Sequence, residues 1–184
     1  MYTPSAISPP AAQRGIVLVV ALILLLILTL LGLAAAQSTS LQERMAGNAR
    51  NQDIAFQSAE AGLSAAESCL NAGLALCTNF AADTAGAYQF NQAAPNNPWE
   101  TAGFWNSAAN YFTYDGVTGA TLSGVSAQPE IIIEQMPPVA VPGGNIGQQQ
   151  FGSGSPTIQL YRITVLGTGG DSTATIMLQG IYGS

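Results

Sequence analysis

Cys69 and Cys77 are the only cysteines in the chain and the clearest pair of residues able to react with each other. On an unbroken helix their Cα atoms would lie about 12 Å apart, beyond the limit of about 7 Å for a disulfide. Residues 71–73 between them read as a helix end, after which the chain can turn back. We therefore expect a disulfide. Two small buried thiols are the alternative, and two cysteines are too few ligands for a metal site.

Other reactive side chains are scarce. The chain has no histidine, which removes the usual general base and the commonest zinc ligand. Asp115 and Asp171 are candidate calcium ligands, but neither lies in a loop with alternating oxygen ligands and a terminal glutamate, so we interpret both as solvated turn carboxylates. With four basic and ten acidic residues, a net charge of −6 argues against direct nucleic-acid binding. We expect no enzymatic activity, metal site or cofactor.

Aromatic side chains gather in one short part of the chain, between positions 99 and 114. A cluster of this kind can form an adhesive or partner-binding patch, because aromatic rings bury a large area at low entropic cost. The favoured interpretation is a packed core, and stacking on single-stranded nucleic acid would need basic neighbours that are missing here. The six residues are Trp99, Phe104, Trp105, Tyr111, Phe112 and Tyr114.

Residues 16–36 form an apolar run interrupted only by Thr29 and Gly32. About 20 such residues suffice to cross a bilayer, and lipid forces the segment to be helical. Arg14 is the sole charge before the run, so we expect a single span with the N-terminus in the cytoplasm. A secretory signal peptide cut after the alanines at 34–36, and an anchor that is never cut, are the alternatives.

An amphipathic helix is predicted to continue from 37 to 72. Apolar residues recur at steps of three and four and define one narrow, alanine-rich face suited to close packing. The predicted face consists of Leu41, Met45, Ala49, Phe56, Ala59, Leu63, Ala66 and Leu70.

The remainder, residues 73–184, is predicted to be a strand-rich head. Strand-like runs occupy 130–136, 158–166 and 173–182, and the Gly-rich connector at 167–172 joins the last two as a hairpin. Residues 137–157 read as a long irregular loop. The fold class is thus α+β, a long N-terminal helix packed against an antiparallel sheet.

These features together resemble a type IV prepilin: a leader at 1–15 that ends in Arg14-Gly15, an apolar helix directly after it, and a strand-rich head. The similarity is closest to the PilX family of minor pilins, over about residues 13–70 and 158–182. Its most specific parts are LQERMAGN at 41–48 and FQSAEA at 56–61, whereas 71–157 carry little of it.

The resemblance implies that prepilin peptidase cuts between Gly15 and Ile16 and methylates the new amine of Ile16. It implies the inner membrane and then the pilus at the cell surface as locations, with roles in pilus assembly, twitching motility and adhesion. Expected partners are the major pilin, other minor pilins, the peptidase, the inner-membrane assembly platform and a PilY-type tip adhesin.

Val20 departs from the pattern of major pilins, which usually have a glutamate at the fifth mature position. In that family the carboxylate is thought to pair with the N-terminal amine of a neighbouring subunit. The next carboxylate here is Glu43, beyond the apolar run, so we expect a subunit at or near the tip, in a priming complex. A minor pseudopilin of type II secretion and a signal-anchored periplasmic binding domain are the alternatives.

Overall fold

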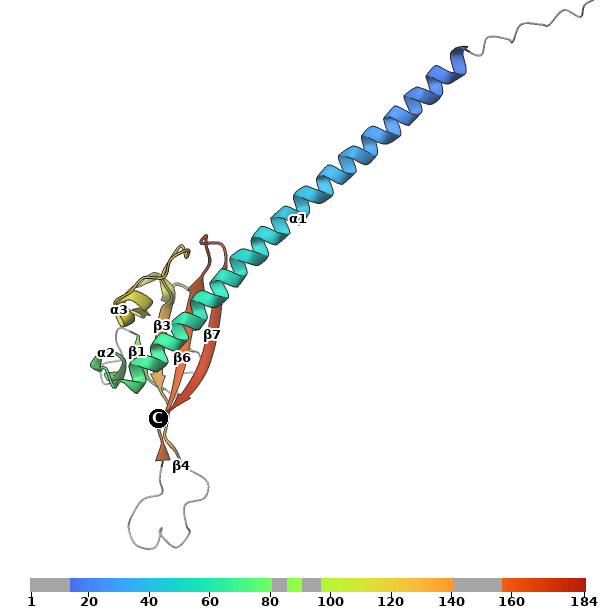
Figure 1. Cartoon of the computed structure of the whole chain (residues 1–184). Helices are drawn as coiled ribbons and strands as arrows, with labels where there is room; N and C mark the ends of the chain where they lie inside the picture. Colours follow the sequence, from blue (N-terminus) through green and yellow to red (C-terminus); the bar gives the residue numbers. More distant parts are fainter. Residues whose placement is uncertain (1–13, 81–85, 91–96, 141–156) are drawn as a thin grey trace, which may run out of the picture. The chain divides into compact units, whose positions relative to one another are not determined.

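The computed structural model describes residues 14–80, 86–90, 97–140 and 157–184 (Figure 1). The chain divides into two units, Met1–Gly47 and Asn48–Ser184, and each is described by itself below. Helix α1 (Arg14–Asn71) supplies the described residues of the first unit and the first element of the second. The predicted leader at 1–15 lies outside the described residues apart from its last two, and these begin α1.

Helix α1 starts two residues before the predicted Ile16 and ends at Asn71, where the sequence predicted its end. The turn after it is a Schellman motif, in which Gly73 N–H donates to Leu70 O (3.0 Å) and Leu74 N–H donates to Cys69 O (3.3 Å). Gly73 has φ +63°, a conformation that favours glycine. The motif pairs the last helical carbonyls and reverses the chain into α2 (Ala75–Thr78).

A five-stranded sheet organises the second unit, with strand order β1-β3-β6-β7 and β2 as an additional neighbour of β3. The predicted hairpin is confirmed, because β6 and β7 pair antiparallel over nine consecutive residue pairs. The head is not purely antiparallel, since β1 pairs parallel to β3. The strands are β1 (Ala87–Gln89), β2 (Phe112–Thr113), β3 (Glu130–Gln135), β6 (Leu160–Thr168) and β7 (Thr175–Gly183).

A short second ribbon pairs β4 (Val139–Ala140) with β5 (Thr157–Ile158). It falls at the two ends of the predicted loop at 137–157, and the rest of that loop, 141–156, lies outside the described residues. The sequence missed β1, β2 and β4, because runs of two or three residues show too little alternation to predict a strand.

The C-terminal part of α1 packs on one face of this sheet (Figure 1). Glycines allow a close approach. A Cβ at Gly62 would lie 2.7 Å from Val165 Cγ1, and one at Gly167 would lie 2.4 Å from the backbone oxygen of Ala55. Buried isoleucines and a valine of β3 and β6 complete this core: Ile131, Ile133, Ile163 and Val165.

The predicted helix face is right for Ala59, Ala66 and Leu70, which are buried. It is wrong for Phe56, which is 40% exposed. The helix instead turns its smallest side chains to the sheet, among them Ala55 and Ser58. Small residues occupy these positions because the backbones of the helix and the sheet lie too close together to accommodate a phenylalanine ring.

Short elements make up the rest of the described head. Two 3-10 turns carry three of the six residues of the predicted aromatic cluster, and α3 follows directly after β2. These elements are η2 (Pro98–Glu100), η3 (Phe104–Asn106) and α3 (Tyr114–Thr118).

Candidate functional site

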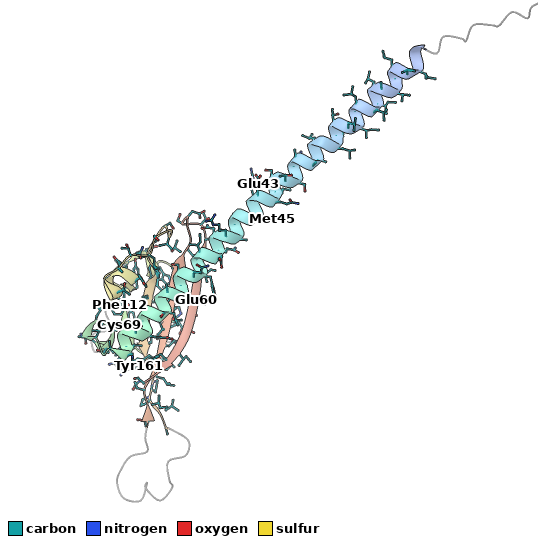
Figure 2. All side chains as sticks on the ribbon, viewed as in Figure 1. Glu43, Met45, Glu60, Cys69, Phe112 and Tyr161 are labelled. Carbon is teal, nitrogen blue, oxygen red and sulfur yellow. A yellow bond between two sulfur atoms is a disulfide. The ribbon has the colours of Figure 1, made fainter. Side chains whose placement is uncertain are left out.

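The predicted disulfide between Cys69 and Cys77 is present, with the two Cα atoms 6.1 Å apart. Cys69 is in the last turn of α1, and Cys77 lies on α2, where it is fully buried. The alternative of two free thiols is therefore wrong. The Schellman turn provides the chain reversal that makes the bond possible, and the bond fixes α2 to the end of the long helix. Figure 2 labels Cys69 beside Phe112 and Tyr161 in the head.

In the first unit, the apolar segment has no partner among the described residues. Its side chains radiate from the helix (Figure 2), and Ile16 is 69% and Val20 50% exposed. The segment is long and apolar enough to cross a membrane. Leu41 and Met45, which were predicted to continue the packing face, are also exposed. A surface of this kind requires lipid or other protein to cover it.

The predicted processing residues Gly15 and Ile16 lie in the first turns of α1. Val20 follows Ile16 by four residues, which places both side chains on the same helix face. No acidic residue occurs in 16–36, so a carboxylate is missing from the whole apolar segment. The polar Thr29 satisfies its hydroxyl by donating to Leu26 O (2.8 Å).

The aromatic cluster combines core residues with residues at the surface. Trp99 and Phe112 are buried, as the packed-core interpretation predicts. The other four residues are half-buried, with ring contacts such as the edge-on packing of Phe104 against Trp105 at 5.5 Å. The Trp105 indole N–H donates to Trp99 O (3.0 Å), so hydrogen bonding as well as ring packing holds the segment.

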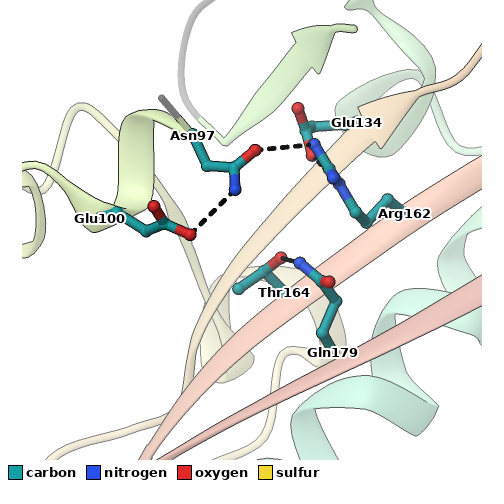
Figure 3. A network of polar contacts seen from close by, with 6 residues as sticks. All are labelled: Asn97, Glu100, Glu134, Arg162, Thr164 and Gln179. Atoms are coloured by element: carbon teal, nitrogen blue, oxygen red, sulfur yellow. Dashed lines mark hydrogen bonds and ion pairs between the residues drawn. The ribbon is translucent and has the colours of Figure 1, made fainter. Parts of the chain in front are cut away.

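Arg162 anchors this segment to the sheet (Figure 3). Its guanidinium bonds to the Glu134 carboxylate on β3, and its Nη2 donates to Asn97 Oδ1 (3.3 Å). The same guanidinium lies 4.7 Å from the Trp99 ring centre and 5.5 Å from that of Phe90. The half-buried charge of Arg162 therefore has an ion pair, a hydrogen bond and two aromatic faces around it.

Two carboxyl groups on β3 have perturbed pKa values. Burial raises the pKa of Glu134, and the hydrogen bond and charge of Arg162 oppose this. Burial also raises the pKa of Glu130, against the opposing hydrogen bond from Tyr111. The pKa of Tyr111 is raised by burial and by the nearby Glu130. Among the described residues, no group of three or more metal-ligating side chains includes either carboxyl group.

Asp171 has a structural role at the tip of the β6–β7 hairpin. Its carboxylate accepts hydrogen bonds from the backbone and side chain of Thr173, which lowers the pKa of Asp171. Asn51 of α1 accepts from the Asp171 backbone N–H (3.2 Å) and ties the hairpin to the helix. Asp115, the other calcium candidate, lies in the first turn of α3.

Sequence reasoning missed the pair of Arg162 and Glu134. Arg162 is the single charge of the strand-like run at 158–166, and Glu134 is one of two acidic residues in the run at 130–136. Because a buried charge is costly without a partner, opposite charges in two strand-like runs indicate an ion pair between neighbouring strands, and this was the signal that the sequence offered.

The second unit therefore has the α+β arrangement of a pilin, with the end of a long helix packed on a sheet, and an exposed apolar helix precedes it along the chain. Two family descriptions match nearly the whole chain: PilX N-terminal over residues 14–64, and type IV pilus assembly protein PilX C-term over residues 69–184. The chain belongs to the PilX family of type IV pilus assembly proteins. No curated protein and no solved structure matches it.

Proposed function

We propose that this chain is a minor pilin that enters the type IV pilus through its N-terminal helix, at or near the tip. The observation that supports this most directly is the apolar surface of residues 16–36, which nothing in the described chain covers. In the membrane, lipid covers this surface before assembly. In a filament, the helices of neighbouring subunits replace the lipid.

We propose that prepilin peptidase removes residues 1–15 by cutting between Gly15 and Ile16, and that the new amine of Ile16 is methylated. The leader would remain in the cytoplasm with Arg14, and the head would enter the periplasm. The disulfide of Cys69 and Cys77 agrees with this topology, because disulfides persist in oxidising compartments.

The tip position rests on Val20. A carboxylate at this place would attract the N-terminal amine of a neighbouring subunit strongly, because a helix bundle excludes water and has a low dielectric constant. Val20 offers no such attraction, and residues 16–36 contain no substitute acid. A subunit without this acceptor starts a filament more readily than it extends one.

The partners that we propose are the major pilin, other minor pilins, prepilin peptidase and the inner-membrane assembly platform. A PilY-type adhesin at the tip is a further proposed partner. The role is structural, in pilus assembly and thus in twitching motility and adhesion. We propose no catalytic role, because the sequence has no histidine, the side chain that most often serves as a general base.

The deciding experiment determines the N-terminus of the protein purified from membranes, by intact mass and peptide sequencing, in cells with and without prepilin peptidase. A methylated Ile16 start that disappears without the peptidase supports the proposal. A start at Gln37 would instead indicate a secreted domain, and an intact Met1 a simple anchor; either result overturns it.

Deletion of the chain in the same cells separates the pilus from type II secretion. Loss of surface pili and twitching, with normal release of secreted enzymes, is the expected result. Normal piliation with failed enzyme release would assign the chain to a secretion system.

A further inference from the structure

Strand β7 is an open edge of the head sheet. It lies last in the strand order and pairs with β6 along its whole length, and no described strand pairs with its other side. The opposite edge is formed by the much shorter β1 and β2. Figure 1 shows β7 as the long outermost strand beside α1.

The hydrogen-bond pattern identifies the backbone groups that point outward from β7. Gln159 and Ser184 exchange both of their backbone hydrogen bonds (3.0 Å each), and Gly169 N–H donates to Ala174 O (2.8 Å). Antiparallel pairs alternate, so every second residue counted back from Ser184 faces β6 and the residues between them face outward. The outward N–H and C=O groups belong to Thr175, Met177, Gln179, Ile181 and Gly183.

This edge lacks the usual protection against strand addition. Charges, prolines and bulges normally protect exposed edges, and β7 has no charged residue, no proline and an unbroken register over nine pairs. Two of its apolar side chains are prominently exposed, Met177 at 45% and Ile181 at 67%. An added strand would form backbone hydrogen bonds with β7, and it would also make apolar contacts with the exposed side chains of Met177 and Ile181.

The helix side of the edge is also apolar and incompletely covered. The Leu63 side chain lies over Gly180 of β7, 3.1 Å from where a Cβ would be. Phe56 precedes Leu63 by seven residues and so occupies the same side of α1 two turns earlier. Its 40% exposure on this side of α1 is consistent with a position that a further strand would cover.

Charge indicates the kind of strand that fits. Glu60 follows Phe56 by four residues and Glu67 follows Leu63 by four, on the same side of α1. No lysine or arginine occurs in 51–71 or in β7 to neutralise them. A second copy of this chain, paired edge to edge, would bring two sets of these carboxylates together, which is unfavourable.

We propose that β7 accepts an extended segment of a different polypeptide, which adds a strand to the head sheet. This segment is apolar on both faces and carries a lysine or arginine on the face toward α1, opposite Glu60 and Glu67. Backbone pairing supplies affinity, and these side chains supply the choice of partner. The proposal concerns the head alone and does not depend on the entry of residues 16–36 into a filament.

In-cell photo-cross-linking of the full chain tests the proposal. The photoreactive amino acid p-benzoylphenylalanine replaces Ile181 in one variant and the exposed Ala108 in a control, and mass spectrometry sequences the cross-linked peptide. The expected result is a Lys- or Arg-containing peptide of another protein, captured from Ile181 but not from Ala108. No capture above the control, or capture of this chain's own β7, overturns the proposal.

Two sets of variants then separate pairing from simple proximity. Met177→Pro removes an outward N–H but leaves the β6 ladder intact, so we expect about fivefold less capture, whereas Met177→Thr retains the N–H and the capture. Glu60→Lys with Glu67→Lys is expected to reduce capture to a similar extent, and Asp115→Lys to leave it unchanged. If the proline variant folds poorly, the charge variants decide alone, and undiminished capture in them contradicts the proposed partner chemistry.

Discussion

Arg162 is the residue on which the packing of the aromatic segment most depends. Its guanidinium neutralises Glu134, whose side chain is only 4% exposed, and contacts the buried Trp99 ring. Through Asn97 it also connects to Glu100, which accepts a hydrogen bond from the Asn97 amide (2.9 Å). Removal of the arginine would leave a buried carboxylate without a counter-charge.

Arg162→Met is therefore expected to lower the free energy of unfolding by about 3 kcal/mol. Urea unfolding of the purified full chain in detergent, followed by tryptophan fluorescence, measures this. The double variant with Glu134→Leu is expected to recover much of the loss, because it removes the stranded charge as well. Equal stability of Arg162→Met and the unsubstituted chain would show that the ion pair contributes nothing.

Glu130 gives the head a dependence on pH. Burial raises the folded-state pKa of Glu130, so the folded chain binds this proton more tightly than the unfolded chain. Stability then falls as pH rises through the interval between the unfolded and the folded pKa. Asp171, with a lowered pKa, acts in the opposite direction and at lower pH.

Glu130→Gln is expected to remove the Glu130 part of this dependence and retain an acceptor for Tyr111. The melting temperature of the variant minus that of the unsubstituted chain should increase as the pH is raised from 4 to 7. Thermal melts at several pH values measure this difference, in which the contribution of Asp171 cancels. A difference that is constant with pH would exclude Glu130 as the source.

At the scale of elements, the contact of α1 with the sheet depends on backbone proximity. A Cβ at Gly167 would lie 2.4 Å from Ala55 O and 2.5 Å from Ala59 N, and neither backbone atom can move without displacing the helix. A Cβ at Gly47, in contrast, would meet no described atom of another element within 4 Å. The two glycines thus provide a tight and an open site for the same substitution.

Gly167→Ala is expected to destabilise the chain by about 1–3 kcal/mol through this overpacking. Gly47→Ala serves as the matched control and is expected to stabilise the helix slightly, since alanine favours helix by about 1 kcal/mol. Urea unfolding compares the two variants. A loss of equal size in both would indicate a general effect of the alanine and not the close contact.

Elements with strong periodicity could be predicted from the sequence, and those set by tertiary contacts could not. The long helix, its end at Asn71, the β6–β7 hairpin and the disulfide follow from local pattern and turn chemistry. The exposure of Phe56 does not, because only the close approach of helix and sheet decides which side of a weakly amphipathic helix is buried. The parallel pairing of β1 is likewise a long-range choice that three residues do not encode.

At the scale of the whole molecule, the two units carry different kinds of surface. Residues 16–36 present apolar side chains without any charge, whereas all ten acidic residues lie at or beyond Glu43. The first surface requires lipid or packed helices. The second unit is acidic and has its own core and disulfide, so it folds around contacts that do not involve the apolar segment.

Val20→Glu tests whether the lack of a carboxylate at position 20 determines where the subunit lies in the filament. A glutamate there would supply the carboxylate that attracts the amine of a neighbouring subunit in a medium of low dielectric constant. The unsubstituted chain, detected with gold-labelled antibody on sheared pili, is expected at one end of each filament, and the variant is expected along the shaft as well. Val20→Gln, of the same size but uncharged, is expected to remain at the end. Even labelling of the unsubstituted chain, or an unchanged position for the glutamate variant, would refute the link between Val20 and the tip.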